Sequence, residues 1–432
     1  MKYLLLIFFL ISEFLNIKTA PAQDFWIRQQ SPTSKNLKNC FFINNNTGWI
    51  SGDSGTIIKT ENAGKNWIIQ DTKILNDIQS LFFINERLGW AIAYEVFPDP
   101  NSFLGTRILK TTDGGSNWIN YMYPDTNKFM RSVYFLDSLT GFLAGAPNII
   151  ARTGNAGMTW ETADTDTTLV FGLPVENIKF YNSQTGFACG GFRDIAGAMW
   201  TTTNGGFNWR GTVIAPEPFM DLYLFDQMNV IAVGGDFEFG ASFVNSTNQG
   251  STWHYDTLGT YGVATAVDFR TAAEGWITIG TAQKFLYTTD RAKTWNSLNT
   301  PDNLAVFDIQ FTDSLHGWAV GYNGALLKYN PLISGISNVN NFIPAGISIS
   351  QNYPNPFNPV THIKYETGIT GHISLKVFDV LGNEVITLVN GNQSPGKYSV
   401  SFDGSNLPSG VYFFRISTDG IFADGKSMLL LK

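Results

Sequence analysis

The chain of 432 residues contains few of the side chains that most active sites use. It has two cysteines, Cys40 and Cys189, and four histidines. Two widely separated cysteines are too few for a disulfide scaffold, so we expect both to be small buried apolar residues. The sequence shows no metal-binding histidine spacing, P-loop, Rossmann fingerprint or G-x-S-x-G elbow. It therefore predicts no catalytic residue, no metal and no cofactor.

Charged residues are also few. Lysine and arginine number 28 against 35 aspartates and glutamates, which gives a net charge of −7, and the basic residues form no cluster. Nucleic-acid binding needs a basic stripe or patch, so no nucleic-acid partner is expected. The 42 glycines and the aromatic content of 14% are instead typical of short strands joined by tight turns.

Long hydrophobic runs are absent beyond the N-terminus. Lys2, an apolar stretch over residues 3–11 and an A-x-A site ending at Ala22 predict a signal peptide over residues 1–22, cleaved before Gln23. The apolar stretch is too short to span a bilayer, and no later segment reaches spanning length. We expect an exported protein without a transmembrane segment.

An eight-residue motif, Ser/Thr-x-Asp/Asn-x-Gly/Ala-x-Thr/Asn-Trp, occurs six times, with its tryptophans 42 to 51 residues apart. Its Asp or Asn can hold a turn by accepting backbone hydrogen bonds, and its Trp can begin a packed strand. In chain order, these two residues of the six copies are Asn62 and Trp67, Asp113 and Trp118, Asn155 and Trp160, Asn204 and Trp209, Asn248 and Trp253, and Asp290 and Trp295.

A second signature, Gly-Trp or Gly-Phe between two apolar strands, occurs six times, and Asn229-Val230 takes its place in a seventh repeat. The last repeat lacks a tryptophan strand, and the segment around Trp26, one repeat before Trp67, can supply it. We therefore predict an all-β fold: a seven-bladed β-propeller over residues 23–330, with four strands per blade, closed by the N-terminal strand.

Periodicity ends after the propeller. Residues 331–347 have the composition of a linker, and residues 348–432 contain short alternating strands that predict a small Ig-like β-sandwich. This segment carries a set of characteristic residues: Tyr353, Pro354, Asn355, Pro356, Phe357, Asn358, Pro359, Gly382, Gly410, Tyr412 and Lys432.

These motifs resemble two known families. The octad resembles the Asp-box (BNR repeat) of bacterial neuraminidases, and with the Gly-Trp signature the repeat looks like the photosystem II assembly/stability factor-like propeller family. The C-terminal segment resembles the type A sorting domain of type IX secretion substrates. That resemblance implies type IX secretion machinery as a partner and a route through the periplasm. The expected location is secreted or on the outer-membrane cell surface.

Three turns that join the second and third strands of a blade are extended and carry aromatic and acidic residues. Binding residues often lie on long loops of a rigid scaffold, so we expect this face to bind a glycan or a protein. The candidate residues are Tyr94, Glu95, Phe97, Phe192, Arg193, Asp194, Asp236, Phe237, Glu238 and Phe239.

The alternative is a secreted glycoside hydrolase, sialidase-like or other, with its active site in the propeller funnel. Sialidases share Asp-boxes but need an arginine cluster and a Tyr/Glu nucleophile pair, and no such arginine cluster is visible in the sequence. Asp-box xyloglucanases use two propellers, and this chain has one. We expect a non-enzymatic binding protein. An arginine cluster in the funnel, or two carboxylates about 5–10 Å apart there, would favour the hydrolase.

Overall fold

A computed structural model describes residues 25–96, 103–165, 172–331, 347–367, 370–380, 382–418 and 421–432. The expected signal peptide with Ala22 and Gln23, the candidate residue Phe97 and most of the expected linker lie outside these ranges. The chain divides into two compact units, Met1–Ile333 and Ser334–Lys432. Within the described ranges, no helix is long and apolar enough to cross a membrane.

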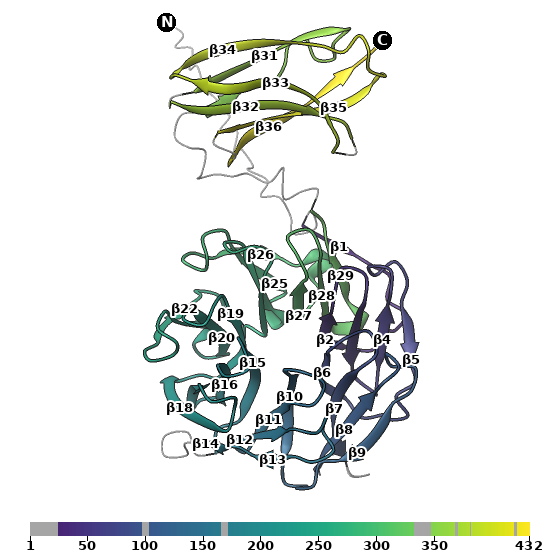
Figure 1. The fold of residues 1–432 in the computed structure, drawn as a ribbon, viewed down its shortest axis with the longest axis vertical. Helices are drawn as coiled ribbons and strands as arrows, with labels where there is room; N and C mark the ends of the chain where they lie inside the picture. The colour runs from purple at the N-terminus through teal and green to yellow at the C-terminus, as the bar shows by residue number, and fades with distance from the viewer. Residues whose placement is uncertain are drawn as a thin grey trace, which may run out of the picture. The chain divides into compact units, whose positions relative to one another are not determined.

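The first unit is the predicted propeller, a ring of seven antiparallel sheets (Figure 1). Each sheet runs from an inner to an outer strand, and the inner strands of neighbouring blades contact one another around the ring. Blade one contains β2 (Leu37–Phe42), β3 (Gly48–Gly52), β4 (Ile57–Thr60) and β5 (Ile68–Gln70). Blade two contains β6 (Ile78–Phe83), β7 (Gly89–Val96), β8 (Phe103–Thr111) and β9 (Ile119–Met122). Blade three contains β10 (Phe129–Phe135), β11 (Gly141–Ala146), β12 (Ile149–Thr153) and β13 (Glu161–Thr162).

The remaining blades follow the same order, with short 3-10 turns in the last two. Blade four contains β15 (Val175–Phe180), β16 (Gly186–Phe192), β17 (Ala196–Thr202) and β18 (Asn208–Ala215). Blade five contains β19 (Phe219–Leu224), β20 (Val230–Asp236), β21 (Gly240–Ser246) and β22 (His254–Thr257). Blade six contains β23 (Ala266–Phe269), β24 (Gly275–Ile279), η1 (Gly280–Ala282), β25 (Lys284–Thr288) and β26 (Asn296–Asn299), followed by η2 (Pro301–Asn303). Blade seven contains β27 (Val306–Phe311), β28 (Gly317–Gly321), η3 (Tyr322–Gly324), β29 (Leu326–Tyr329) and the N-terminal β1 (Trp26–Arg28).

The N-terminal strand closes the ring as predicted. Strand β1 pairs antiparallel with β29, and Trp26 lies opposite Tyr329. The indole of Trp26 is fully buried, stacks on Phe285 with ring centroids 5.2 Å apart, and packs at 5.6 Å against Phe311. The N-terminal strand and the last blade therefore share one aromatic core.

Blade four differs from the expected four strands. A fifth strand, β14 (Asp164–Thr165), pairs in parallel with the outer strand β18, with Thr165 opposite Trp209. The amide of Asp164 donates to the carbonyl of Phe207 at 3.0 Å, and its carboxylate accepts from Asn208 at 2.9 Å. The chain leaving blade three therefore covers part of the outer edge of blade four.

The Gly-Trp signature needs glycine because the ring of a phenylalanine six residues earlier lies against its backbone. A Cβ added at Gly89 would lie 2.4 Å from the ring of Phe83. That ring in turn stacks on Trp49 of the preceding blade, with centroids 3.6 Å apart. The close contact of ring and glycine recurs at Phe42–Gly48, Phe135–Gly141, Phe180–Gly186, Phe269–Gly275 and Phe311–Gly317, and stacking on a tryptophan of the preceding blade recurs at Phe42 and Phe135. The signature therefore marks where one blade packs on the next.

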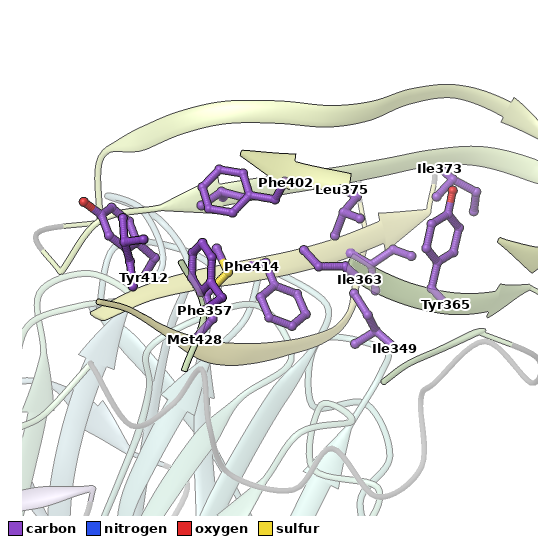
Figure 2. Packing of buried hydrophobic residues seen from close by; sticks show 13 residues of the cluster. Ile349, Phe357, Ile363, Tyr365, Ile373, Leu375, Phe402, Tyr412, Phe414 and Met428 are labelled. Atoms are coloured by element: carbon purple, nitrogen blue, oxygen red, sulfur yellow. The ribbon is translucent and has the colours of Figure 1, made fainter. Parts of the chain in front are cut away.

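The second unit is the predicted small β-sandwich. One sheet contains β30 (Ile347–Ile349), β31 (Val360–Thr367) and β34 (Gly396–Asp403). The other contains β33 (Glu384–Gln393), β32 (Gly371–Phe378), β35 (Gly410–Thr418) and β36 (Ile421–Leu430). Figure 2 shows the side chains that fill the space between them, among them Phe357, Ile363, Leu375, Phe402 and Phe414.

Candidate functional site

The Asp-box residues build identical turns. In the second copy, the hydroxyl of Thr111 accepts from the amide of Gly115 at 2.8 Å, and Asp113 Oδ1 accepts from the amide of Asn117 at 2.8 Å. The other five copies repeat both bonds, at Asn62, Asn155, Asn204, Asn248 and Asp290. The tryptophans that follow are buried or half-buried between blades: Trp67, Trp118, Trp160, Trp209, Trp253 and Trp295. The Asp and Asn residues therefore hold structural turns, and the tryptophans pack beside them.

Three aspartates on inner strands link neighbouring blades. Asp308 accepts from the amide of Cys40 at 2.7 Å, and Asp268 accepts from the amide of Phe311 at 2.6 Å. Asp221 likewise accepts from the amide of Val267 at 3.0 Å. In each case the carboxylate accepts a hydrogen bond from a backbone amide on the inner strand of the next blade. This set was not predicted from the sequence, although Asp221 and Asp308 stand at matching positions of their strands.

The environment of these aspartates is electrostatically unusual. Lys179 Nζ donates to Asp221 at 2.8 Å. The side chains of Asp268 and Asp308 keep some accessible surface, but protein surrounds them closely enough that desolvation raises the pKa of each carboxyl to about 7. A pKa shift of this kind is common at active sites, but the backbone amides that these carboxylates hold fit a structural role.

The inner strands do not assemble the arginine cluster that a sialidase requires, although the charge of Asp221 acts on both Asp268 and Asp308 there. The seven inner strands contain one arginine, Arg131, and its guanidinium bonds to Glu176 of the next blade. A Tyr/Glu pair exists, because the phenol of Tyr255 donates to Glu217, but Tyr255 lies on the outer strand β22. Burial and the nearby carboxylates raise the pKa of Tyr255, which disfavours the phenolate that a nucleophile needs. Among the described residues, no group of three or more His, Cys, Asp or Glu could hold a metal ion.

Two of the three extended turns meet on the face opposite the Asp-boxes. The guanidinium of Arg193, from the β16–β17 turn, lies 5.1 Å from the ring centroid of Phe237, in the β20–β21 turn. Phe237 also lies 6.0 Å from Tyr261, which follows β22. Tyr261 was not among the predicted residues because it follows an outer strand, although the connections between blades emerge on this face.

Large apolar side chains are exposed around this contact. Phe192 is 52% exposed, Phe239 53% and Tyr261 67%. We call the following set the aromatic patch: Phe192, Arg193, Ile195, Phe237, Phe239 and Tyr261. The exposed residues Asp194 and Glu238 lie in the same two turns. The structure thus brings together the predicted loops of blades four and five.

The remaining candidate residues lie elsewhere or point inward. Asp236 is fully buried, and its Oδ1 accepts from the amides of Glu238 at 2.9 Å and Phe239 at 2.7 Å. It therefore shapes the turn and does not face a partner, which corrects its assignment as a surface residue. Tyr94 and Glu95 are half-buried on blade two, where Glu95 pairs with Arg107 of the same blade.

Two open hollows of about 880 and 460 Å³ lie on the Asp-box side of the ring. The larger is lined by Asn44–Thr47 and Asp313, and Asn44 already accepts from two amides of its own turn. The smaller is lined by Asp-box turns of blades four and five. Neither hollow includes a residue of the aromatic patch.

The sorting-motif residues occupy one end of the sandwich. Phe357 and Tyr412 are buried in its core, and Tyr353 is 81% exposed although its backbone is bonded on both sides to His362. The Tyr412 phenol donates to the carbonyl of Pro408, and Lys432 Nζ donates to that of Ser405. The other motif residues lie in the same turns and strands: Pro354, Asn355, Pro356, Asn358, Pro359, Gly382 and Gly410.

Comparisons with known families agree with this two-part architecture. Residues 351–428 match the family described as secretion system C-terminal sorting domain, and residues 99–218 match the family described as photosynthesis system II assembly factor YCF48. The photosystem II stability/assembly factor HCF136 of Oryza sativa subsp. japonica is 32% identical over 123 residues, which cover 27% of this chain and 28% of the relative. That match spans little more than a quarter of the relative's length.

Solved structures share the propeller fold. YCF48 bound to D1 peptide superimposes with a TM-score of 0.56 at 21% identity, covering 72% of this chain and 99% of that one. YCF48 from Cyanidioschyzon merolae gives 0.57 at 18% identity, covering 71% and 99%. The GH74 xyloglucanase from Xanthomonas campestris also gives 0.57, at 11% identity, covering 71% and 53%. At these identities the likeness concerns the fold, which binding proteins and enzymes share.

Proposed function

We propose that this chain, a YCF48-like propeller joined to a C-terminal secretion sorting domain, is an exported non-enzymatic binding protein. Its sorting domain implies export by type IX secretion machinery and a location outside the cell or on its surface. The signal peptide over residues 1–22 would begin that route, and the propeller over residues 23–330 would be the delivered domain. The partner is a glycan or a protein.

The aromatic patch is the observation that carries this proposal. Single exposed apolar residues are normal, but clustered ones mark interaction sites. Here four exposed aromatic residues and Ile195 lie in neighbouring turns with an arginine whose guanidinium lies over the ring of Phe237. Aromatic residues and arginine dominate the energetic centres of protein interfaces. The patch has the composition of a binding surface.

The electrostatics of the funnel support binding over catalysis. The inner-strand aspartates are engaged by backbone amides, and the one inner-strand arginine is held by a carboxylate. The matched sequence relative is named an assembly factor, and one solved YCF48 is described as bound to a peptide. A peptide or protein partner for this chain is consistent with those descriptions.

The test is a binding screen of the full mature chain against a glycan array and a phage-displayed random-peptide library, with each hit assayed for turnover. A variant with Phe192, Phe237 and Phe239 all changed to serine should lose the selected ligands at least tenfold. Met158→Ser is the matched control, because Met158 is exposed on an Asp-box turn at the opposite face. Turnover of any hit, or unchanged binding by the triple variant, would contradict the proposal.

A further inference from the structure

Beneath the aromatic patch, two carboxylates are buried without a cationic partner. Glu217 and Asp236 are both fully buried, and neither occurs among the ion pairs of the described residues. One oxygen of each is satisfied, by the phenol of Tyr255 and by the turn amides respectively. The other oxygens, Glu217 Oε2 and Asp236 Oδ2, have no hydrogen-bond partner in the protein.

The backbone places these two residues side by side. The amide of Gly235 donates to the carbonyl of Pro218 at 2.9 Å, so the residue before Asp236 is bonded to the residue after Glu217. Glu217 comes from the connection between blades four and five, and Asp236 from the end of β20. Two different segments therefore place these residues next to each other, and the charges of both carboxylates act on the Tyr255 phenol.

A hydroxyl joins them from the same face of blade five. Ser242 lies opposite Gly234, two residues before Asp236, and Tyr255 lies opposite Val244, two residues after Ser242. Side chains two apart on a strand, and those directly opposite across a pair, share a face. Asp236, Ser242 and Tyr255 thus project from one face, and Ser242 Oγ is also buried without a partner.

The local potential is negative. Burial and the charges of Glu217, Asp236 and Asp256 together raise the pKa of the Tyr255 phenol. A buried carboxylate without compensation is strongly unfavourable, so the site needs a proton or a cation. The oxygens without a hydrogen-bond partner belong to two carboxylates and a hydroxyl. Oxygen ligands suit a hard cation and not a metal that prefers nitrogen or sulfur.

We propose that Glu217, Asp236 and Ser242 bind a calcium ion between blades four and five, with water or backbone oxygens completing its ligands. Calcium fits better than magnesium, because magnesium keeps several waters and the three side chains are fully buried. Two carboxylates give a site of modest charge, and dissociation constants on the order of 10⁻⁴ to 10⁻³ M are typical of extracellular calcium modules. Such a site suits an exported protein.

The ion would also act on the binding surface. Asp236 begins the turn that carries Phe237 and Phe239, so a ligated Asp236 would fix the position of both rings. This consequence rests on the proposed function and predicts calcium-dependent partner binding. The site itself does not depend on it.

The test measures calcium directly on the full chain after chelation and desalting. Titration with CaCl₂, followed by calorimetry and by the unfolding temperature, should show one site with a midpoint on the order of 10⁻⁴ to 10⁻³ M. Glu217→Gln and Asp236→Asn keep the oxygens that bond Tyr255 and the turn, and each should weaken calcium binding at least tenfold. Glu238→Gln, an exposed residue of the same turn, should bind like the wild type.

Both variants should fold without calcium at least as well as the wild type, because each removes a buried charge. A wild-type chain with no calcium heat and no change in unfolding temperature would overturn the site. Calcium binding by either variant equal to that of the wild type, or an equal response of the wild type to MgCl₂ at matched ionic strength, would overturn the assignment. Because no binding partner is present in the calcium titration, a negative result there would not contradict the proposed binding function. A failed binding screen would likewise not contradict the calcium site.

Discussion

Replacing Trp26 with alanine should weaken the closure of the ring. The indole is fully buried and contacts four aromatic rings, those of Trp276, Phe285, Phe311 and Tyr329. Removing a buried tryptophan costs about 3–5 kcal/mol of unfolding free energy, because the lost contacts leave a cavity. The unfolding entropy of a propeller of about 300 residues is about 0.6 kcal/mol per kelvin, so the unfolding temperature should fall by about 5–8 °C.

Ile27→Ala is the matched control. Ile27 is the next residue on the same strand and is 47% exposed, so its loss should lower the unfolding temperature by less than about 1–2 °C. Calorimetry of the full chain would measure both variants, with the sandwich transition as an internal reference if it is resolved. Equal losses for the two variants would refute the conclusion that the Trp26 ring anchors the closing strand.

Three further predictions follow from the blade contacts. Burial raises the pKa of Asp268 and Asp308 to about 7, so the folded state holds protons that the unfolded state releases above about pH 4, and stability should fall as pH rises from 4 to 7. Denaturant unfolding at pH 5 and pH 8 should show Asp308→Asn removing about 1–2 kcal/mol of that fall, and an unchanged pH profile would contradict it. Gly89→Ala places a Cβ 2.4 Å from the Phe83 ring and should lower the unfolding free energy by about 1–3 kcal/mol. In the control Gly154→Ala the nearest neighbour lies 3.9 Å away, so the loss should be under about 0.5 kcal/mol. Similar denaturation midpoints for the two variants would argue against the clash. Thr111→Val removes the hydroxyl that binds the Gly115 amide and should cost about 1–2 kcal/mol in the same assay, more than Ser116→Ala on the exposed side of that turn.

The sequence predicted the propeller because its signals are local and repeated. The octad and the Gly-Trp signature each lie within one hairpin, so their spacing gives the number of blades directly. The closing strand followed because Trp26 stands one repeat before Trp67. Strand β14 was missed because its two residues, Asp164–Thr165, carry no pattern of their own and pair only through the tertiary arrangement.

The site was harder to predict because loop membership does not give side-chain direction. Phe237 and Asp236 are neighbours in one turn, yet the first is exposed and the second is fully buried. Contacts between blades were also hidden, since Asp308 and Cys40 are bonded across 268 positions of sequence. Aligning the inner strands places Asp221 and Asp308 at the same position, but only the structure shows that they bond to the next blade.

The pairing of β1 with β29 also determines how the ring responds to force. Trp26 lies opposite Tyr329, so the chain enters and leaves the propeller at the same end of one antiparallel strand pair. Tension applied between those two points would load the hydrogen bonds one after another, as in a zipper, and would not shear them all together. A pull through both ends should therefore peel blade seven open at low force.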